Sequence, residues 1–179
     1  MRELIKNKRV AIVGNAKSLL NNEYGIEIDS YDIVCRLNRG IKIINSTAQG
    51  TRTDIWGYGD YSLIKDYMND TYCKNTIHLS RFRLQNLISP KTRYYVELDE
   101  LSDLESKLNW SFPSSGLIIL FYVLNRNPIA TTVYGFDNFA SLSAFNTTEE
   151  NAVKSSHNWN LERILIEQWT ETFNITLRA

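Results

Sequence analysis

Short apolar runs alternate with segments of helical period along this chain. The first apolar run covers residues 9–13, and the segment 15–21 directly after it has the spacing of a short helix. The same pattern predicts further strands at 32–37, 53–57, 75–79, 93–97, 131–136 and 175–178. It predicts further helices at 60–69, 98–108, 114–127 and 160–173. Strands separated by helices are typical of βαβ units.

Strands in βαβ units run parallel and are covered by helices on both faces. We therefore expect an α/β fold with three layers (αβα) and a mostly parallel, Rossmann-like sheet. A chain of 179 residues with 43% hydrophobic side chains is long enough for one full core. Because no internal repeat or low-complexity segment interrupts the pattern, residues 1–179 are expected to form one domain.

Composition argues against nucleic acid as a partner, against a membrane-spanning or secreted protein, and against a disulfide. The chain has 20 Lys and Arg and 20 Asp and Glu, so no net positive field favours nucleic acid as a partner. No apolar run approaches the roughly 18–20 residues that span a bilayer, and the first residues lack a signal peptide's apolar segment, which predicts a cytoplasmic protein. Cys35 and Cys73 stand singly, which favours reduced structural thiols over a metal site or a disulfide.

Ligands of parallel sheets bind beyond the carboxyl ends of the strands, and the first candidate there is the turn Gly14-Asn15. The turn has neither GxGxxG nor GxxxxGK[ST], which argues against dinucleotide and ATPase sites. Glycine lets a ligand approach the backbone closely, and asparagine offers both a hydrogen-bond acceptor and donors. The alternative is a tight turn whose asparagine caps the next helix.

A second candidate is the segment from Pro113 to Gly116, at the start of a predicted helix. The first N–H groups of a helix have no partner within it and carry the positive end of its dipole, so they suit a phosphate. Ser114 or Ser115 would cap this helix, and Gly116 permits close approach. Ordinary helix capping explains these residue types equally well.

His157 is the third candidate, because it lies just before the predicted helix 160–173. The positive end of a helix dipole favours the neutral imidazole, which is the form that a general base requires. Glu162 would orient or anchor this loop. The alternative is a surface or capping histidine, and His78, within a predicted strand, is interpreted as structural.

Together these segments resemble the sialylmotifs of the eukaryotic-type sialyltransferases. The stretches "VAIVGNAKSLL", "GIEIDSYDIVCRLNRG" and "GTRTDIW" resemble their large motif. The stretches "PSSGLIILFYVLN" and "TTVYGF" resemble the small motif, and "HNWNLE" fits the very small motif His-xxxx-Glu. The resemblance covers about residues 9–57, 111–137 and 155–166. The segment from about 60 to 108 does not align.

The resemblance implies a GT-A-like variant of the Rossmann-like sheet and an inverting glycosyltransferase that needs neither a metal ion nor another cofactor. It would move sialic acid, or a related CMP-activated acid such as Kdo, from a CMP-sugar donor to a hydroxyl group of a glycan or glycolipid acceptor. The catalytic base would be His157. The residues expected to bind CMP are Gly14, Asn15, Asn38, Ser114, Ser115, Gly116, Gly135 and Phe136. The chain contains no Asp-x-Asp triplet of the kind that holds a divalent metal in many other glycosyltransferases.

The chain also departs from the family pattern. Val10 replaces a cysteine that pairs with one in the small motif, which favours a reducing cytoplasm of a bacterium or its virus, with peripheral membrane association as an option. Phe112 replaces a tyrosine, and residues 137–156 lack the histidine of a third motif. A CMP-binding protein or a CMP-sugar hydrolase therefore stays as the alternative. Trp56, Trp110 and Trp159 would stack on acceptor sugars or fill the core.

Overall fold

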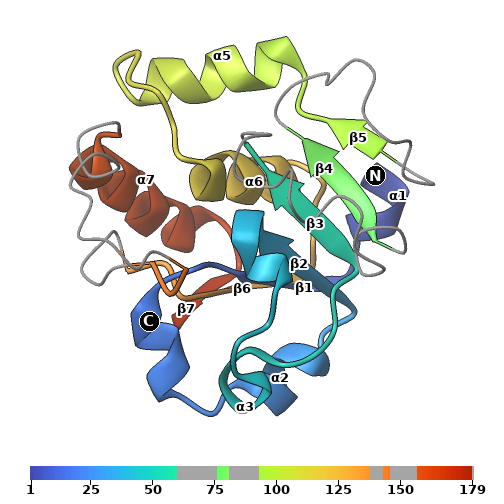
Figure 1. Cartoon of the computed structure of the whole chain (residues 1–179). Helices are drawn as coiled ribbons and strands as arrows, with labels where there is room; N and C mark the ends of the chain where they lie inside the picture. Colours follow the sequence, from blue (N-terminus) through green and yellow to red (C-terminus); the bar gives the residue numbers. More distant parts are fainter. Residues whose placement is uncertain (60–75, 81–92, 138–142, 146–156, 179) are drawn as a thin grey trace.

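In the computed structural model, the described residues form one sheet of seven strands, in which each strand is parallel to its neighbours (Figure 1). The structure describes residues 1–59, 76–80, 93–137, 143–145 and 157–178. The strands are β1 (Arg9–Val13), β2 (Ile33–Leu37), β3 (Ile55–Tyr58), β4 (Ile77–Ser80), β5 (Arg93–Tyr95), β6 (Ala130–Tyr134) and β7 (Ile175–Arg178). Their order across the sheet is β5-β4-β3-β2-β1-β6-β7. This confirms the predicted parallel α/β fold.

The longer helices also follow the sequence pattern. The α-helices are α1 (Arg2–Ile5), α2 (Gly25–Asp29), α3 (Ser46–Gln49), α5 (Leu98–Lys107), α6 (Ser115–Leu124) and α7 (Trp159–Thr172). Two 3₁₀ segments, η1 (Lys17–Asn21) and η2 (Asn38–Ile41), follow β1 and β2. The sequence pattern missed α1, α2 and α3 because helices of four or five residues are too short to show a helical period. The helix predicted at 60–69 lies outside the described residues.

Each face of the sheet packs against its own layer of helices. Val10, Ile12 and Cys35 project from one face into the core that contains α5, α6 and α7, whereas Ala11 and Val13 project from the other face towards η1 and α2. Figure 1 shows α5, α6 and α7 on one side of the sheet and α2 and α3 on the other. The predicted three-layer arrangement is therefore present, while a single domain over residues 1–179 stays a prediction.

Helix α6 lies at the centre of its layer. All its residues from Leu117 to Leu124 are buried, which is the pattern of a helix surrounded by protein. Trp169 of α7 stacks on Phe121 of α6 with 5.6 Å between ring centroids. The first residue of α6, Ser115, lies against Gly59 just after β3, because a Cβ atom at Gly59 would be 2.2 Å from the Ser115 hydroxyl. The buried helix therefore presents its N-terminus at the carboxyl ends of the strands.

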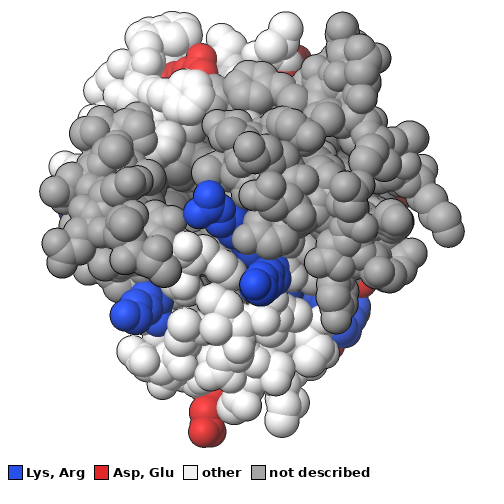
Figure 2. All heavy atoms as spheres, viewed as in Figure 1, with Lys and Arg blue, Asp and Glu red and all other residues white. Residues whose placement is uncertain are grey.

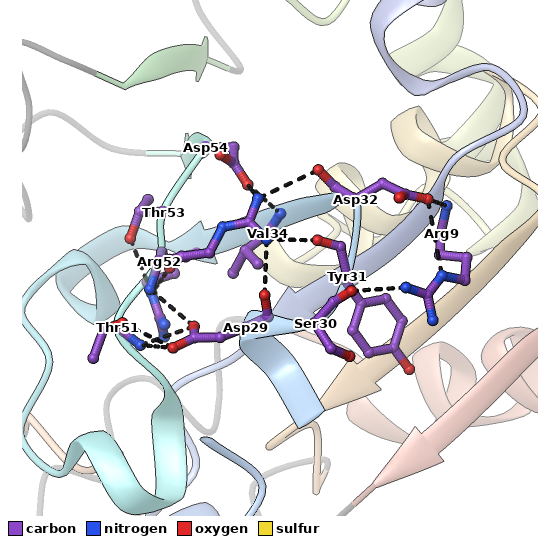
Figure 3. Close-up of polar contacts among 11 residues, drawn as sticks. Arg9, Asp29, Ser30, Tyr31, Asp32, Val34, Thr51, Arg52, Thr53 and Asp54 are labelled. Atoms are coloured by element: carbon purple, nitrogen blue, oxygen red, sulfur yellow. Dashed lines mark hydrogen bonds and ion pairs between the residues drawn. The ribbon is translucent and has the colours of Figure 1, made fainter. Parts of the chain in front are cut away.

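The loops before β2 and β3, at the amino ends of these strands, are joined by a polar network (Figure 3). The Arg52 guanidinium donates to the carbonyl oxygens of Asp29 (2.8 Å) and Tyr31 (2.7 Å) and to the Asp54 carboxylate (2.9 Å). The Asp29 carboxylate accepts from the Thr51 backbone and hydroxyl groups and from the Arg52 N–H. This part of the large motif therefore stabilises the fold at a distance from the carboxyl ends of the strands.

Cys35 is a buried free thiol in β2. Burial within β2 raises the pKa of the free Cys35 thiol to about 12, so it stays protonated at neutral pH, and Cys73 lies outside the described residues. Figure 2 shows basic side chains across the middle of one face and acidic ones near its rim. Among the described residues, no helix combines the length and the apolar character needed to cross a bilayer.

Candidate active site

The turn after β1 packs directly on the turn after β6. A Cβ atom at Gly14 would lie 2.5 Å from the Gly135 carbonyl oxygen and 2.7 Å from the Phe136 ring, so a side chain is excluded at position 14. Gly135 itself has a positive φ of 65°, a conformation that glycine adopts without strain. The Phe136 ring also touches Gly116, where a Cβ atom would be 3.0 Å from it. The four residues therefore interlock at the carboxyl ends of β1 and β6.

Asn15 does not cap the segment that follows it. The N-cap of η1 is Ala16, and no side chain makes a capping hydrogen bond there. Instead, the Asn15 Oδ1 atom is buried against Gly40, where a Cβ atom would approach it to 2.4 Å, and it has no hydrogen-bond partner among the described residues. A buried acceptor without a donor is costly, so this atom is suited to receive a hydrogen bond from a ligand.

Asn38, directly after β2, has a left-handed conformation with φ of 46°. Its backbone oxygen accepts a hydrogen bond from Trp56 Nε1 at 2.7 Å, and its side-chain oxygen accepts one from the Gly59 N–H at 3.3 Å. The side-chain nitrogen is left as the group that can bind a ligand, and it acts as a donor. Trp56 is fully buried, so it does not stack on a sugar.

Ser114 and Glu162 hold the start of α6. The Ser114 hydroxyl accepts from the Leu117 N–H at 3.2 Å and donates to Glu162 Oε2 at 2.6 Å, while the Ser114 N–H donates to Glu162 Oε1 at 2.7 Å. Glu162 is only 2% exposed, and burial raises the pKa of its carboxyl group although the bonds from Ser114 act in the opposite direction. Ser114 is therefore committed to α7, whereas the Ser115 and Gly116 N–H groups at the helix start remain for a ligand.

His157 is oriented by the backbone just before α6. Its Nδ1 atom lies 2.9 Å from the Phe112 carbonyl oxygen. Because a carbonyl can only accept, we assign the proton to Nδ1, which leaves Nε2 as an acceptor in the neutral ring. The Phe112 ring stacks on the imidazole with 5.8 Å between ring centroids. The Trp159 ring lies edge to face with the imidazole, with 5.0 Å between centroids. Asn158, not His157, caps α7, so the imidazole is available for another role.

The structure brings several of the predicted site residues together. Asn15, Asn38, Gly116 and Phe136 meet around the carboxyl ends of β1, β2, β3 and β6, and two contacts between the start of α6 and the start of α7 bring His157 to the same corner. Sequence reasoning missed Gly40 and Gly59, which make room for Asn15 and Ser115. The signal that could have revealed Gly59 is its position, because it is a glycine soon after a predicted strand.

A parallel three-layer sheet with glycine turns, amide side chains and a helix N-terminus at the carboxyl ends of its strands is an arrangement typical of α/β proteins that bind nucleotides. The family model described as glycosyltransferase family 29 (sialyltransferase) matches residues 4–94 of this chain. The chain belongs to this family.

Individual relatives agree with this assignment. The type 2 lactosamine alpha-2,3-sialyltransferase of Mus musculus is 32% identical over 131 residues, which are 72% of this chain and 38% of the relative. The Homo sapiens protein of the same name is 27% identical over 135 residues, covering 74% and 39%. This chain thus spans less than half the length of either relative. Both are mammalian, which gives no support to the predicted bacterial or phage-type source.

Solved structures share the fold. The sialyltransferase CstII from Campylobacter jejuni, in complex with cytidine-5'-monophosphate, aligns with a TM-score of 0.64 at 17% identity and covers 96% of this chain and 79% of its own. A mammalian sialyltransferase in complex with Gal-beta-1-3GalNAc-ortho-nitrophenol aligns with a TM-score of 0.62 at 15% identity and covers 98% and 71%. At this level of identity the alignments establish the three-dimensional arrangement alone.

Proposed function

We propose that this protein transfers sialic acid, or a related CMP-activated sugar acid, from a CMP-sugar donor to a glycan hydroxyl group. One observation carries the proposal: His157 Nδ1 bonds to the Phe112 carbonyl oxygen just before α6, which leaves Nε2 as the acceptor of an imidazole held near the start of α6, where an anion would bind. A base and an anion site are the two elements that transfer from a CMP-sugar requires.

The polar groups of the site divide between the parts of CMP. The Ser115 and Gly116 N–H groups and the Asn38 side-chain nitrogen are donors, so they suit the phosphate. The buried Asn15 Oδ1 is an acceptor, so it suits a ribose hydroxyl or the cytosine amino group rather than an ionised phosphate. Phe136, Gly14 and Gly135 form the packed wall behind these groups.

The chemistry then needs one proton transfer and one departing anion. His157 Nε2 takes the proton from the acceptor hydroxyl, whose oxygen attacks the anomeric carbon as the bond to CMP breaks. General-base catalysis of this kind contributes about 10² to 10⁴ in rate. The helix N-terminus and Asn38 stabilise the negative charge on the departing phosphate without a cation. A single displacement inverts the anomeric configuration, and we propose that no metal ion takes part.

The acceptor side of the site is aromatic. Phe112 is 48% exposed and flanks His157 together with Trp159. Aromatic rings of this kind pack well against the apolar face of a sugar. The relatives named above act on lactosamine, so we propose a galactose-terminated glycan or glycolipid as the acceptor. A cytoplasmic location with peripheral membrane association stays a prediction.

The decisive experiment measures release of CMP from CMP-sialic acid with and without N-acetyllactosamine, in the presence of EDTA. We expect release that depends on the acceptor, and a loss of at least about 10²-fold in His157→Ala. Glu167→Ala, on the exposed side of α7, is the matched control and should keep the wild-type rate. The anomeric configuration of the product, read by NMR, tests inversion.

Other outcomes point to other functions. Release of CMP that does not respond to any acceptor would indicate a CMP-sugar hydrolase. Binding of CMP without release would indicate a binding protein, after CMP-Kdo has been tried as the donor. Activity that disappears in EDTA and returns with a divalent cation would contradict the metal-independent mechanism.

A further inference from the structure

Asn38 is held in a backbone conformation that side chains disfavour. Its φ of 46° lies in the left-handed region, which asparagine enters more readily than most residues but still at a cost. Such a conformation persists where neighbouring contacts enforce it, and such positions gather at functional sites.

Both enforcing contacts come from β3 and the residue that follows it. Trp56 Nε1 donates to the Asn38 carbonyl oxygen at 2.7 Å, and the Gly59 N–H donates to the Asn38 side-chain oxygen at 3.3 Å. The first contact sets the peptide plane, and the second sets which end of the amide faces away from β3. The end of the amide turned away from the Gly59 N–H is then its nitrogen.

Trp56 is itself rigid. It is fully buried, and its ring lies 4.9 Å from Tyr58 and 5.2 Å, edge to face, from His78. Its partner across the sheet is Arg36 of β2, two residues before Asn38. The indole N–H therefore occupies one place relative to the end of β2, and it can orient the Asn38 carbonyl without rearrangement.

We propose that Trp56 is a positioning residue: its indole N–H, together with the Gly59 N–H, holds Asn38 so that only the side-chain nitrogen faces the nucleotide. Asn38 then acts as a hydrogen-bond donor to the CMP phosphate, and Trp56 affects the donor substrate without touching it. This inference rests on the proposed function, because it concerns the same CMP site.

The test compares CMP affinity, measured by isothermal titration calorimetry, in four proteins and a control. Trp56→Phe keeps a buried aromatic ring and removes the N–H donor, so we expect CMP affinity to fall about three- to tenfold. Trp169→Phe, which removes another buried indole, one that stacks on Phe121, is the control and should change affinity less than about twofold.

The double variant separates positioning from a general structural role. Glycine adopts a positive φ freely and has no amide side chain, so in Asn38→Gly there is nothing left for Trp56 to position. Trp56→Phe should therefore have no further effect on CMP affinity in the Asn38→Gly background. An equal loss in both backgrounds would overturn the inference.

An NMR measurement on the wild-type protein covers the case in which Trp56→Phe does not fold. We expect the Trp56 indole N–H to be protected from exchange and its resonance to shift on addition of CMP, while that of Trp169 does not. Rapid exchange of the Trp56 N–H would overturn the inference. If the wild type binds CMP and Trp56→Phe binds it with the same affinity, the inference alone is overturned. If the wild type binds no CMP, the proposed function is overturned as well.

Discussion

Glu162 illustrates a residue whose contacts are structural although it belongs to a functional motif. Its two carboxylate oxygens receive the hydroxyl and the N–H of Ser114, which lies 48 residues earlier in the chain. The carboxylate thereby fixes the start of α6, whose next N–H groups face the proposed phosphate position. Removing it altogether in Glu162→Ala would leave a buried N–H without an acceptor, at a cost of about 1–3 kcal/mol.

The free energy of unfolding should depend on pH according to whether Glu162 is charged or neutral. Burial raises the pKa of Glu162 above its ordinary value, so its contribution to stability is fully present below that value and is lost as the pH rises through the folded-state pKa. Glu162→Gln keeps an acceptor for Ser114 and does not ionise. As the pH rises above the ordinary pKa of a glutamate, about 4, the stability of the Gln variant measured by urea unfolding should therefore increase relative to that of the wild type.

The exposed Glu167 on the same helix supplies the comparison, since it pairs with Arg163 at the surface. Glu167→Gln should follow the wild-type pH dependence throughout this range. If Glu162→Gln also follows it, the raised pKa is wrong.

The elements β1, β6 and α6 depend on one another through small residues. Gly14, at the end of β1, meets the Gly135 carbonyl and the Phe136 ring, and Phe136 in turn meets Gly116 in the first turn of α6. These contacts bring three elements that are distant in the sequence within reach of one nucleotide. At Gly14 the packing leaves space for a hydrogen atom and for nothing larger, whereas Gly116 is in contact with the Phe136 ring alone among these groups.

Substitution at the two glycines should therefore differ in effect. Gly14→Ala places a methyl group 2.5 Å from a backbone oxygen that cannot move easily, and overpacking of this kind costs about 1–3 kcal/mol. Gly116→Ala meets only the edge of the Phe136 ring at 3.0 Å, so it should cost less. Urea unfolding and calorimetric CMP titration of both variants check the order, and a larger loss in Gly116→Ala would contradict it.

Across the protein, the two ends of the sheet have different tasks. The network of Arg52 and Asp29 joins the loops at the amino ends of β2 and β3 (Figure 3), whereas the proposed CMP site lies at the carboxyl ends. Burial alone would raise the pKa of Asp29, but its hydrogen bonds from Arg52 and Thr51 outweigh burial and lower it. Stability from Asp29 is therefore present above its ordinary pKa and is lost as the pH falls through the lowered one.

This separation predicts that stability and ligand binding respond differently to Arg52→Leu. The variant removes a donor shared by three backbone carbonyls and a carboxylate, so the free energy of unfolding should fall by about 1–3 kcal/mol. Calorimetric CMP affinity of the folded variant should stay within about twofold of the wild type. Arg163→Leu, whose partner is a surface glutamate, should change stability by less than about 0.5 kcal/mol.

Much of the fold followed from local pattern. The apolar runs of β1, β2 and β6 and the helical periods of α5, α6 and α7 are properties of neighbouring residues, and they predicted both the elements and a parallel sheet. The Gly-Asn turn and the Pro-Ser-Ser-Gly segment, which the sequence singled out, both lie at the carboxyl ends of the strands. The family resemblance was also carried by contiguous residues, which is why it was visible without a structure.

Long-range contacts, by contrast, assigned the individual groups their tasks. The sequence left Asn15 and Ser114 open between ligand binding and helix capping, and Trp56 open between a sugar platform and the core. In the structure Asn15 Oδ1 is a buried acceptor, Ser114 caps α6 and binds Glu162, and the buried Trp56 donates to Asn38. The tautomer of His157 depends on a carbonyl 45 residues away. A periodic pattern records which side chains are buried, but a hydrogen bond depends on the positions of two atoms, and folding alone brings those atoms together.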